Sequence, residues 1–386
     1  MKTNLGFESE ICPENAYYRE ARDGVFDIFG LLCPRKLDHY RRVPEDVAAA
    51  TSTSVAALSS NTAGGRLRFS TDSEYIALYA EMPSMADMSH FARTGSSAFD
   101  IYVKCGAKYV YHDTFMPTLG DHYEAISRFK VPGMKDVMLH FPTYSDVKNL
   151  YIGVAEGSRI EHSAPYRYSK PVVYYGSSIT QGACASRPGN AYEAIISNDL
   201  DCDFINLGFS GSALAEEAIT DYINSLDMSV FVMDYDHNAP NPEHLERTHE
   251  AFFKKIRASH PDLPVIMISR PTFEEGYGGP HAYGISVIPP ENEMLRCREV
   301  VFRTYMNAVN AGDRSVYFID GASLFNGPHA DLCTVGGQNR KFCIRGSSRG
   351  SRLTGLFRSR TPNAPLILSA CQRLKPMSPF GEKNKI

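Results

Sequence analysis

Three short polar stretches follow apolar segments in the middle of the chain, and each carries a residue suited to acyl transfer. The first is GSSIT, in which Ser178 follows the apolar run PVVYY. The second is GFSG, which follows DFINL and contains Gly211, whose backbone N–H can approach a ligand without an intervening Cβ. The third is DHNAP, which follows SVFVMDY and supplies the side-chain amide of Asn238. A hydroxyl nucleophile and preorganised donors for a developing oxyanion are the groups that ester hydrolysis needs.

The serines of the first stretch also have an ordinary structural explanation. Ser177, Ser178 and Thr180 are all suitable helix N-caps, so a Gly-Ser-Ser turn alone is weak evidence for a nucleophile. The three stretches together are stronger evidence, because parallel strands bring their carboxyl ends to one edge of a sheet. We therefore expect Ser178, Gly211 and Asn238 to meet at that edge.

The segments that must position these residues alternate between apolar strands and amphipathic helices from Pro171 to Gly321. The expected strands are PVVYYGSS, DFINLGFS, SVFVMDY, PVIMISRP and SVYFIDG, and the expected helices include ALAEEAITDYINSL, HLERTHEAFFKKIRASH and MLRCREVVFRTYMNAV. Strands that are apolar throughout and alternate with helices predict an α/β fold with a doubly wound parallel sheet.

The chain before this region has a different pattern of apolar and polar residues. Between Gly65 and Gly157, short runs such as RLRFS, EYIALYAEM and AFDIYVKC alternate apolar and polar residues between turn signals. This period of two predicts an antiparallel β-sandwich with one buried face. We expect a jelly-roll-like accessory domain over residues 1–165 and the α/β domain over residues 171–335.

Residues 336–386 form a third region with an atypical basic composition. They hold eleven Lys or Arg residues against one acid, Glu382, so they carry +10 in a chain whose net charge is −4. The basic residues are spread singly, and the segment has no sustained hydrophobic period. We expect an irregular tail.

Composition narrows the class of protein. The chain has 386 residues, of which 43% are hydrophobic and 22% charged, which suits a globular protein of two domains. The net charge of −4 gives no reason to expect nucleic acid or anionic lipid as a partner. No run approaches the length of a membrane span, and the N-terminal residues MKTNLGFESE lack the apolar core of a signal peptide. We therefore expect a cytoplasmic protein with no nucleic-acid or membrane partner, and a homo-oligomer remains open.

The nine cysteines are scattered and include no C-x-x-C pair. This spacing argues against both a disulfide framework and a zinc site, so reduced packing residues are expected. We predict no cofactor and no metal.

The order GSSIT, GFSG and DHNAP resembles the blocks of the SGNH, or GDSL-type, serine hydrolases. Ser177 stands where the usual G-D-S has its acid, a departure also seen in one bacterial branch of that family. This branch carries an N-terminal β-domain with a G-x-D-L-Y motif, which SAFDIYVK (Ser97 to Lys104) resembles. The resemblance covers about residues 10–335 and implies a flavodoxin-like doubly wound sheet preceded by a β-sandwich. It also implies a serine esterase acting on small-molecule or carbohydrate acyl esters, often acetyl groups.

The resemblance assigns roles to three residues and leaves one role empty. Ser178 is implied as the nucleophile, and the oxyanion hole is implied to consist of the Ser178 and Gly211 backbone N–H groups and the Asn238 side chain. Family members finish with D-x-x-H-P, in which the Asp orients the His that deprotonates the serine. In this chain Gly336 stands where the Asp belongs and Asn339 where the His belongs, and neither can accept the proton.

The abnormal composition begins at the same position as the missing block. We hypothesise that residues 336–386 come from a shifted reading frame or an alternative C-terminus. The hypothesis is wrong if neither of the other two frames after Val335 encodes D-x-x-H-P and an amphipathic helix.

Other groups could act as the base. His329 and Asp331 lie after the last expected strand, but the sequence H-A-D reverses the usual order, which makes His329 a weak candidate. His237 precedes Asn238, and adjacent strand residues point to opposite faces, so we do not expect both at one substrate.

A metal site is a further alternative for the acidic and histidine residues near the third stretch. Asp234 and Asp236 share a face of the expected strand, but His244 and His249 lie five residues apart, off a shared helical face. We expect a solvated helix there and no metal.

Two functions of different classes fit the sequence. The first is an SGNH-type hydrolase of short-chain or acetyl esters, impaired by the missing Asp/His block. The second is a non-catalytic acyl- or carbohydrate-binding relative. The lack of Trp weakens a carbohydrate-binding platform, although 22 Tyr residues could stack on sugars. A disrupted gene product with no settled function is a third alternative.

Overall fold

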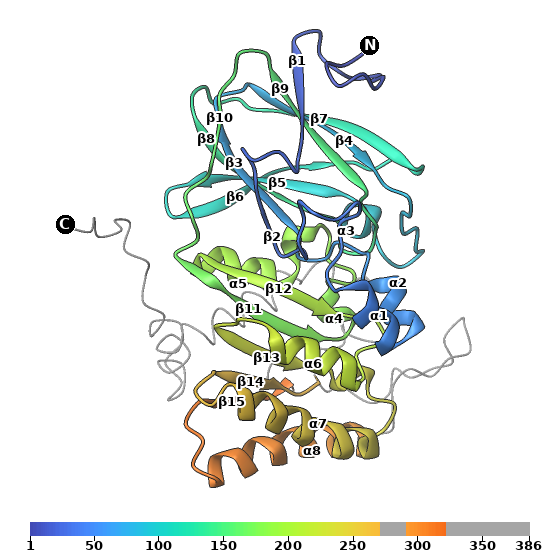
Figure 1. Cartoon of the computed structure of the whole chain (residues 1–386), viewed down its shortest axis with the longest axis vertical. Coiled ribbons are helices and arrows are strands. Elements are labelled where there is room, and N and C mark those ends of the chain that lie inside the picture. The colour runs from blue at the N-terminus through green and yellow to red at the C-terminus, as the bar shows by residue number, and fades with distance from the viewer. Residues whose placement is uncertain (271–290, 322–386) are drawn as a thin grey trace, which may run out of the picture.

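The computed structural model of the chain describes residues 1–270 and 291–321, with the side chains of residues 291 and 292 excepted. An antiparallel β domain stacks on a parallel α/β domain, as Figure 1 shows. The expected irregular tail, residues 336–386, lies outside the described residues.

The N-terminal domain consists of two antiparallel sheets, in the strand orders β1-β9-β4-β7 and β10-β3-β8-β5-β6, with β2 paired to β3. Its strands are β1 (Ala16–Glu20), β2 (Asp27–Phe29), β3 (Arg66–Thr71), β4 (Tyr75–Glu81), β5 (Phe99–Cys105), β6 (Lys108–Phe115), β7 (His122–Arg128), β8 (Lys135–His140), β9 (Asn149–Ala155) and β10 (Ile160–Glu161). Alternate residues of both sheets meet in one apolar cluster, to which Phe69, Leu78 and Leu139 belong. The predicted antiparallel domain is therefore confirmed, while its exact limits stay a prediction.

The α/β domain contains a five-stranded parallel sheet in the order β12-β11-β13-β14-β15. The strands are β11 (Tyr168–Gly176), β12 (Cys202–Gly208), β13 (Val230–Asp234), β14 (Val265–Ile268) and β15 (Val316–Ile319). In chain order this is 2-1-3-4-5, the flavodoxin-like order, which confirms the expected fold class.

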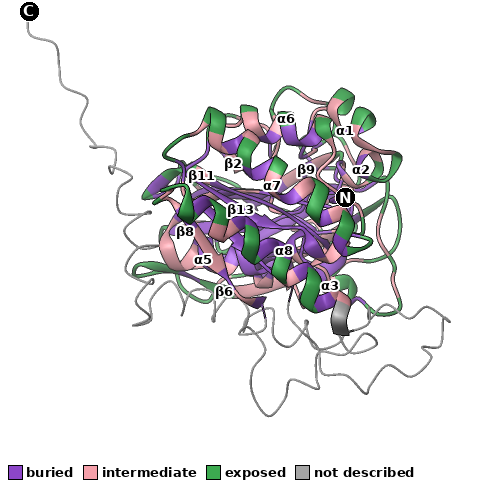
Figure 2. Cartoon of the chain, turned by 90° about the horizontal axis from the view of Figure 1, so that it is seen from below, coloured by how far each residue is buried: buried purple, intermediate pink, exposed green. Residues whose placement is uncertain are grey.

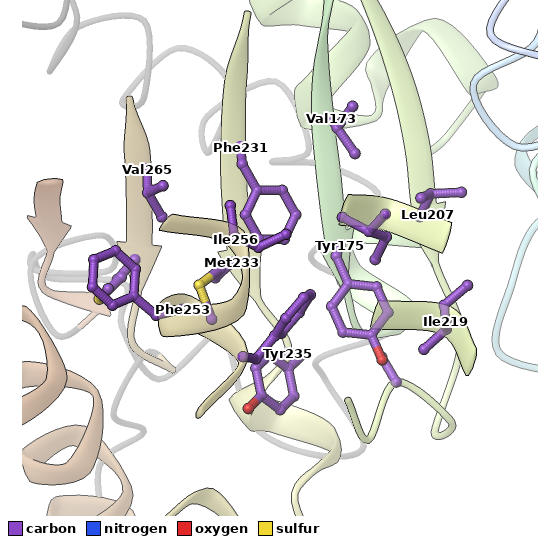
Figure 3. Close-up of a cluster of buried hydrophobic side chains, with 14 of the residues drawn as sticks. Val173, Tyr175, Leu207, Ile219, Phe231, Met233, Tyr235, Phe253, Ile256 and Val265 are labelled. Atoms are coloured by element: carbon purple, nitrogen blue, oxygen red, sulfur yellow. The ribbon is translucent and has the colours of Figure 1, made fainter. Parts of the chain in front are cut away.

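Helices cover both faces of this sheet. The helical segments of the domain are α4 (Ser178–Gln181), η1 (Pro188–Asn190), α5 (Tyr192–Leu200), α6 (Glu217–Ser225), η2 (Asp236–Asn238), α7 (Pro242–Ser259) and α8 (Glu291–Asn310). Val173 and Tyr175 of β11 pack toward α6, α7 and α8, in the cluster that Figure 3 shows. Tyr174, between them in sequence, faces the opposite way and packs against Tyr192 of α5. Seen from below, buried residues fill the sheet and exposed ones follow the outer sides of the helices (Figure 2).

Short helices from the N-terminal part of the chain are built into the α/β core. They are α1 (Glu45–Thr51) and α2 (Thr53–Leu58), whereas α3 (Arg93–Ser96) lies within the β domain. Ala48 and Val55 are buried in the same cluster as the inner residues of α6. The two domains therefore share apolar contacts.

No helix in residues 1–270 and 291–321 is long and apolar enough to span a bilayer. The six cysteines that lie in those ranges are all free thiols.

Candidate active site

The three polar stretches lie at strand ends that are aligned with one another. Gly176, the last residue of β11, pairs in register with Gly208 of β12 on one side and with Asp234 of β13 on the other. GSSIT, GFSG and DHNAP leave the sheet from these three positions. The order of strands reverses between β11 and β13, so the stretches occupy the switch point where such sheets bind ligands.

Ser177 and Ser178 have separate structural roles. Ser177 is the N-cap of α4, and its hydroxyl accepts a hydrogen bond from the Ile179 backbone N–H at 3.3 Å. Ser178 is the first residue of the helix and is half-buried, and its hydroxyl has no hydrogen-bond partner in the described part of the chain. Capping therefore accounts for Ser177 and leaves the Ser178 hydroxyl available.

The second stretch forms a turn that presents Gly211. The Ser212 N–H donates to the Phe209 carbonyl oxygen at 3.0 Å, and Gly211 adopts φ +67°, which favours glycine. A Cβ at Gly211 would have no neighbour within 4 Å. Across residues 1–270 and 291–321, neither the Gly211 nor the Ser178 backbone N–H has an intramolecular acceptor.

Asn238 is joined to the same turn. Its Nδ2 donates to the Phe209 carbonyl oxygen at 2.8 Å, and the Phe209 N–H donates to the Gly176 carbonyl oxygen at 2.9 Å. An amide nitrogen has two hydrogens, so one remains for a ligand. The chain thus brings Asn238 and the Gly211 turn together beside the strand that leads to Ser178.

Residues 236–238 form the 3-10 turn η2 and not a continuation of β13. The expectation that His237 and Asn238 point to opposite faces rested on strand geometry, so its premise is wrong. The Ser178 hydroxyl has no hydrogen bond to His237 or to any other histidine in the described residues.

Buried polar contacts beneath the turn fix helix α4, and the sequence did not reveal them. The Asp234 carboxylate accepts hydrogen bonds from the hydroxyls of Thr180 and Tyr192, at 3.2 and 3.1 Å. Asn206, inside β12, donates to the Thr180 carbonyl oxygen at 2.6 Å. Side chains on β12, β13 and α5 therefore set the position of α4.

We had expected the histidines of α7 to lie on a solvated face, and this expectation is wrong. His249 is buried, because α7 turns it onto the ring of Tyr235, and its Nδ1 lies 3.0 Å from the Thr304 hydroxyl. Burial lowers the pKa of His249 to about 4. His244 lies 2.9 Å from the Leu214 carbonyl oxygen through its Nε2. Both act as structural residues.

The acidic pair considered for a metal is occupied by protein contacts. Asp234 holds Thr180 and Tyr192, while Asp236 accepts the Arg270 backbone N–H at 2.7 Å. Burial raises the pKa of Asp236 to about 6. No three His, Cys, Asp or Glu side chains within residues 1–270 and 291–321 are grouped so as to hold a metal ion. The weak base candidate His329, with Asp331, Gly336 and Asn339, lies outside the described residues.

Both domains of the chain match known protein families. Residues 169–336 match the GDSL-like lipase/acylhydrolase family, and residues 16–160 match the GxDLY family, the N-terminus of SGNH-hydrolase-type esterases. The chain belongs to the GDSL-like hydrolases. By this resemblance it is a carboxylic ester hydrolase, of the branch with a GxDLY N-terminal domain. The match to the hydrolase family ends at Gly336, where the D-x-x-H block would begin.

Solved structures agree with this assignment. A protein described as a GDSL-like lipase from Bacteroides ovatus is 25% identical, with a TM-score of 0.73, over 88% of this chain and 98% of its own. The salicylyl-acyltransferase SsfX3 of a tetracycline biosynthetic pathway is 18% identical, with a TM-score of 0.64, over 90% and 100% of the two chains. A family two carbohydrate esterase from Clostridium thermocellum, solved as an active-site mutant, is 11% identical, with a TM-score of 0.57, over 90% and 99%. The last two support the fold alone, and no curated protein matches the chain.

Proposed function

We propose that this GDSL-like hydrolase cleaves short-chain or acetyl esters by using Ser178 as its nucleophile. The observation that carries the proposal is the convergence of three strand ends at the switch point of the sheet. There Ser178 has an available hydroxyl and the Gly211 turn is held to Asn238. The Ser178 and Gly211 N–H groups and the second Asn238 amide hydrogen are the oxyanion donors.

We further propose that the activity is impaired, because the sequence has Gly336 and Asn339 in place of the catalytic Asp and His. Serine is a poor nucleophile without a base. Disabling a triad costs on the order of 10⁶ in turnover and leaves about 10³ to 10⁴ over water. The expected activity is therefore low, because the Ser178 hydroxyl must attack without a base, helped only by the oxyanion donors and substrate binding.

The substrate class is proposed as an acyl ester of a small molecule or a carbohydrate. Two neighbours with the same fold are an acyltransferase and a carbohydrate esterase, which favours acyl chemistry on a polar alcohol. A cytoplasmic location fits the free thiols of the six described cysteines, since a reducing compartment keeps thiols unpaired.

The test compares hydrolysis of 4-nitrophenyl acetate by the full chain, Ser178→Ala and Ser177→Ala, after intact mass has confirmed the C-terminus. Ser177→Ala is the matched control, since it removes the neighbouring hydroxyl and only the cap of α4. We expect Ser178→Ala alone to abolish the enzymatic turnover. Equal rates for Ser178→Ala and the full chain would refute a serine mechanism.

A non-catalytic binding protein is the second candidate, and the replaced Asp/His block favours it. Such a protein would bind an acetylated oligosaccharide with equal affinity before and after Ser178→Ala. Equilibrium binding measured on both proteins, together with absent Ser178-dependent turnover, would establish this alternative.

A further inference from the structure

The side chain of Gln181 joins three parts of the molecule. It lies at the end of α4, is fully buried, and accepts the Ser210 backbone N–H on Oε1 at 2.9 Å. Its Nε2 donates to Asn61 Oδ1 at 3.1 Å and to the Thr143 carbonyl oxygen at 3.2 Å. The Ser210 donor fixes which end of the amide is oxygen, so both Nε2 hydrogens point to the two acceptors.

The partners of Gln181 come from both domains. Ser210 directly precedes Gly211 in the turn 209–212, which we call the oxyanion loop. Asn61 follows α2, and Thr143 lies between β8 and β9 of the N-terminal β domain. One amide therefore connects the nucleophile helix, the oxyanion loop and the N-terminal part of the chain.

We propose that Gln181 is a positioning residue through which the N-terminal domain holds the oxyanion loop in register with Ser178. The proposal rests on the function proposed above and adds a role for the N-terminal domain in that site. Holding the Ser210 N–H fixes the backbone immediately before the Gly211 N–H. The accessory domain is then part of the catalytic unit.

The anchor on the N-terminal side is itself held firmly. Asn61 donates through Nδ2 to Asp146 Oδ1 at 2.8 Å. The buried Arg42 guanidinium donates to the Asn61 carbonyl oxygen at 2.8 Å and to the Gly208 carbonyl oxygen at 2.6 Å. Arg42 thus ties the anchor to the last residue of β12, where the oxyanion loop begins. A displacement of Asn61 is transmitted to the loop by two routes.

A further contact reaches the nucleophile itself from the N-terminal domain. The Tyr144 hydroxyl donates to the Ser178 carbonyl oxygen at 3.3 Å. Tyr144 directly follows Thr143, so one short segment touches both α4 and the Gln181 amide. Both of the implied backbone oxyanion donors therefore lie next to groups that the N-terminal domain holds.

The contacts of Asn198 provide a control, because they cross the same domain interface away from the loop. Asn198 of α5 accepts the Tyr109 N–H at 2.9 Å and donates to the Tyr109 carbonyl oxygen at 2.7 Å. Asn198→Ala removes two interdomain hydrogen bonds, as Gln181→Met does on the N-terminal side, but leaves α4 and residues 209–212 untouched. A loss of general interface stability would affect both variants.

The experiment measures kcat and KM for 4-nitrophenyl acetate and the amide hydrogen exchange of residues 209–212 in the full chain. For Gln181→Met we expect kcat to fall about 10- to 100-fold with KM nearly unchanged, since small misplacements of reacting groups are costly. Exchange of residues 209–212 should become faster. Asn61→Ala, which removes only the anchor, should have the same signature in weaker form, and Asn198→Ala should match the full chain.

Gln181→Glu adds a pH signature that a purely structural role would not produce. In its protonated form, the carboxyl group of this variant retains the acceptor for Ser210 and one donor. Ionisation places a carboxylate against the oxygens of Asn61 and Thr143, and burial raises the pKa of such a carboxyl. Flipping the Asn61 amide gives no relief, because its oxygen would then face Asp146. The activity of the variant relative to the full chain should fall as pH rises.

Unchanged kcat and unchanged exchange of residues 209–212 in Gln181→Met would overturn the proposal. So would a flat pH ratio for Gln181→Glu, or an equal effect of Asn198→Ala. If the full chain shows no Ser178-dependent turnover, the proposed esterase function fails separately. The exchange of residues 209–212 in the folded variants then decides the coupling on its own.

Discussion

Gly208→Ala should displace helix α4, which carries the proposed nucleophile Ser178, through steric contact alone. Gly208 ends β12, and a Cβ there would lie 2.6 Å from the Thr180 carbonyl carbon and 2.7 Å from Gln181 Cα, with the Gln181 nitrogen closer still. These are backbone atoms, so no change of rotamer relieves the overlap. The φ of Gly208 is not in the left-handed region, which leaves the close approach as the only obstacle to alanine.

The size of the effect follows from the overlap. Carbon atoms rest at about 3.5 Å, so α4 must shift by roughly 1 Å relative to β12. Overpacking of this kind costs about 1–3 kcal/mol in the free energy of unfolding. A shift of about 1 Å at a reacting group can cost about 100-fold in rate. We expect both losses in Gly208→Ala, since Ser178 moves with α4.

The measurement combines urea denaturation with the turnover of 4-nitrophenyl acetate by the folded protein. Gly24→Ala is the control, because a Cβ at Gly24 has no neighbour within 4 Å and its φ is ordinary. If Gly208→Ala equals Gly24→Ala in both measurements, the argument from close approach is refuted. A loss of stability with unchanged turnover would show that the position of α4 does not limit the reaction.

Three further predictions address an oxyanion donor, a buried cation and a buried histidine. Asn238→Ala should lower kcat by about 10²- to 10³-fold with KM within a few-fold in steady-state kinetics, and a change in KM alone would contradict the oxyanion role. Arg42→Met should lower the free energy of unfolding by about 2–4 kcal/mol, since Arg42 donates to four backbone carbonyls, and an unchanged urea midpoint would contradict this. Burial lowers the pKa of His249 to about 4, below the value of about 6.5 expected in the unfolded chain. The neutral imidazole therefore makes its full contribution to the free energy of unfolding above pH 6.5, and this contribution is lost as pH falls toward 4. In His249→Gln, the loss of unfolding free energy between pH 6.5 and pH 4 should be smaller by up to about 3 kcal/mol. Parallel curves of unfolding free energy against pH for the two proteins would refute the role of His249 in this loss.

The order and type of the strands could be predicted from the sequence because apolar runs and periodicity carry that information. PVVYYGSS, DFINLGFS and SVFVMDY become β11, β12 and β13 as expected, although β11 already begins at Tyr168. The bounds of helix α5 were not predicted, since Tyr192–Leu200 mixes buried Glu193 with apolar residues and has no clear apolar stripe. Strand β7 was missed because only two of its residues, Tyr123 and Ser127, are buried. Where burial does not follow a simple period, tertiary packing decides the element.

Part of the candidate site could be predicted from the order of the strands. Ser178, Gly211 and Asn238 follow strands that run to one edge, so topology alone brings their segments together. Gln181 carried no comparable signal, because a glutamine in a short helix is normally exposed and its partner Asn61 is 120 residues distant in the chain. Only the folded arrangement of both domains reveals that this amide is fully satisfied.

The proposed nucleophile and oxyanion donors depend on a different part of the chain from the catalytic base that we propose is lacking. The Ser178, Gly211 and Asn238 segments are held by β11, β12, β13 and the N-terminal domain, all within residues 1–270. The family's Asp and His would follow β15, at positions that Gly336 and Asn339 occupy. In the proposed mechanism, a change confined to the C-terminal segment removes proton transfer and leaves the contacts of the proposed oxyanion donors in place. If the proposed mechanism holds, such a protein still polarises an ester carbonyl and fails chiefly at activating the serine.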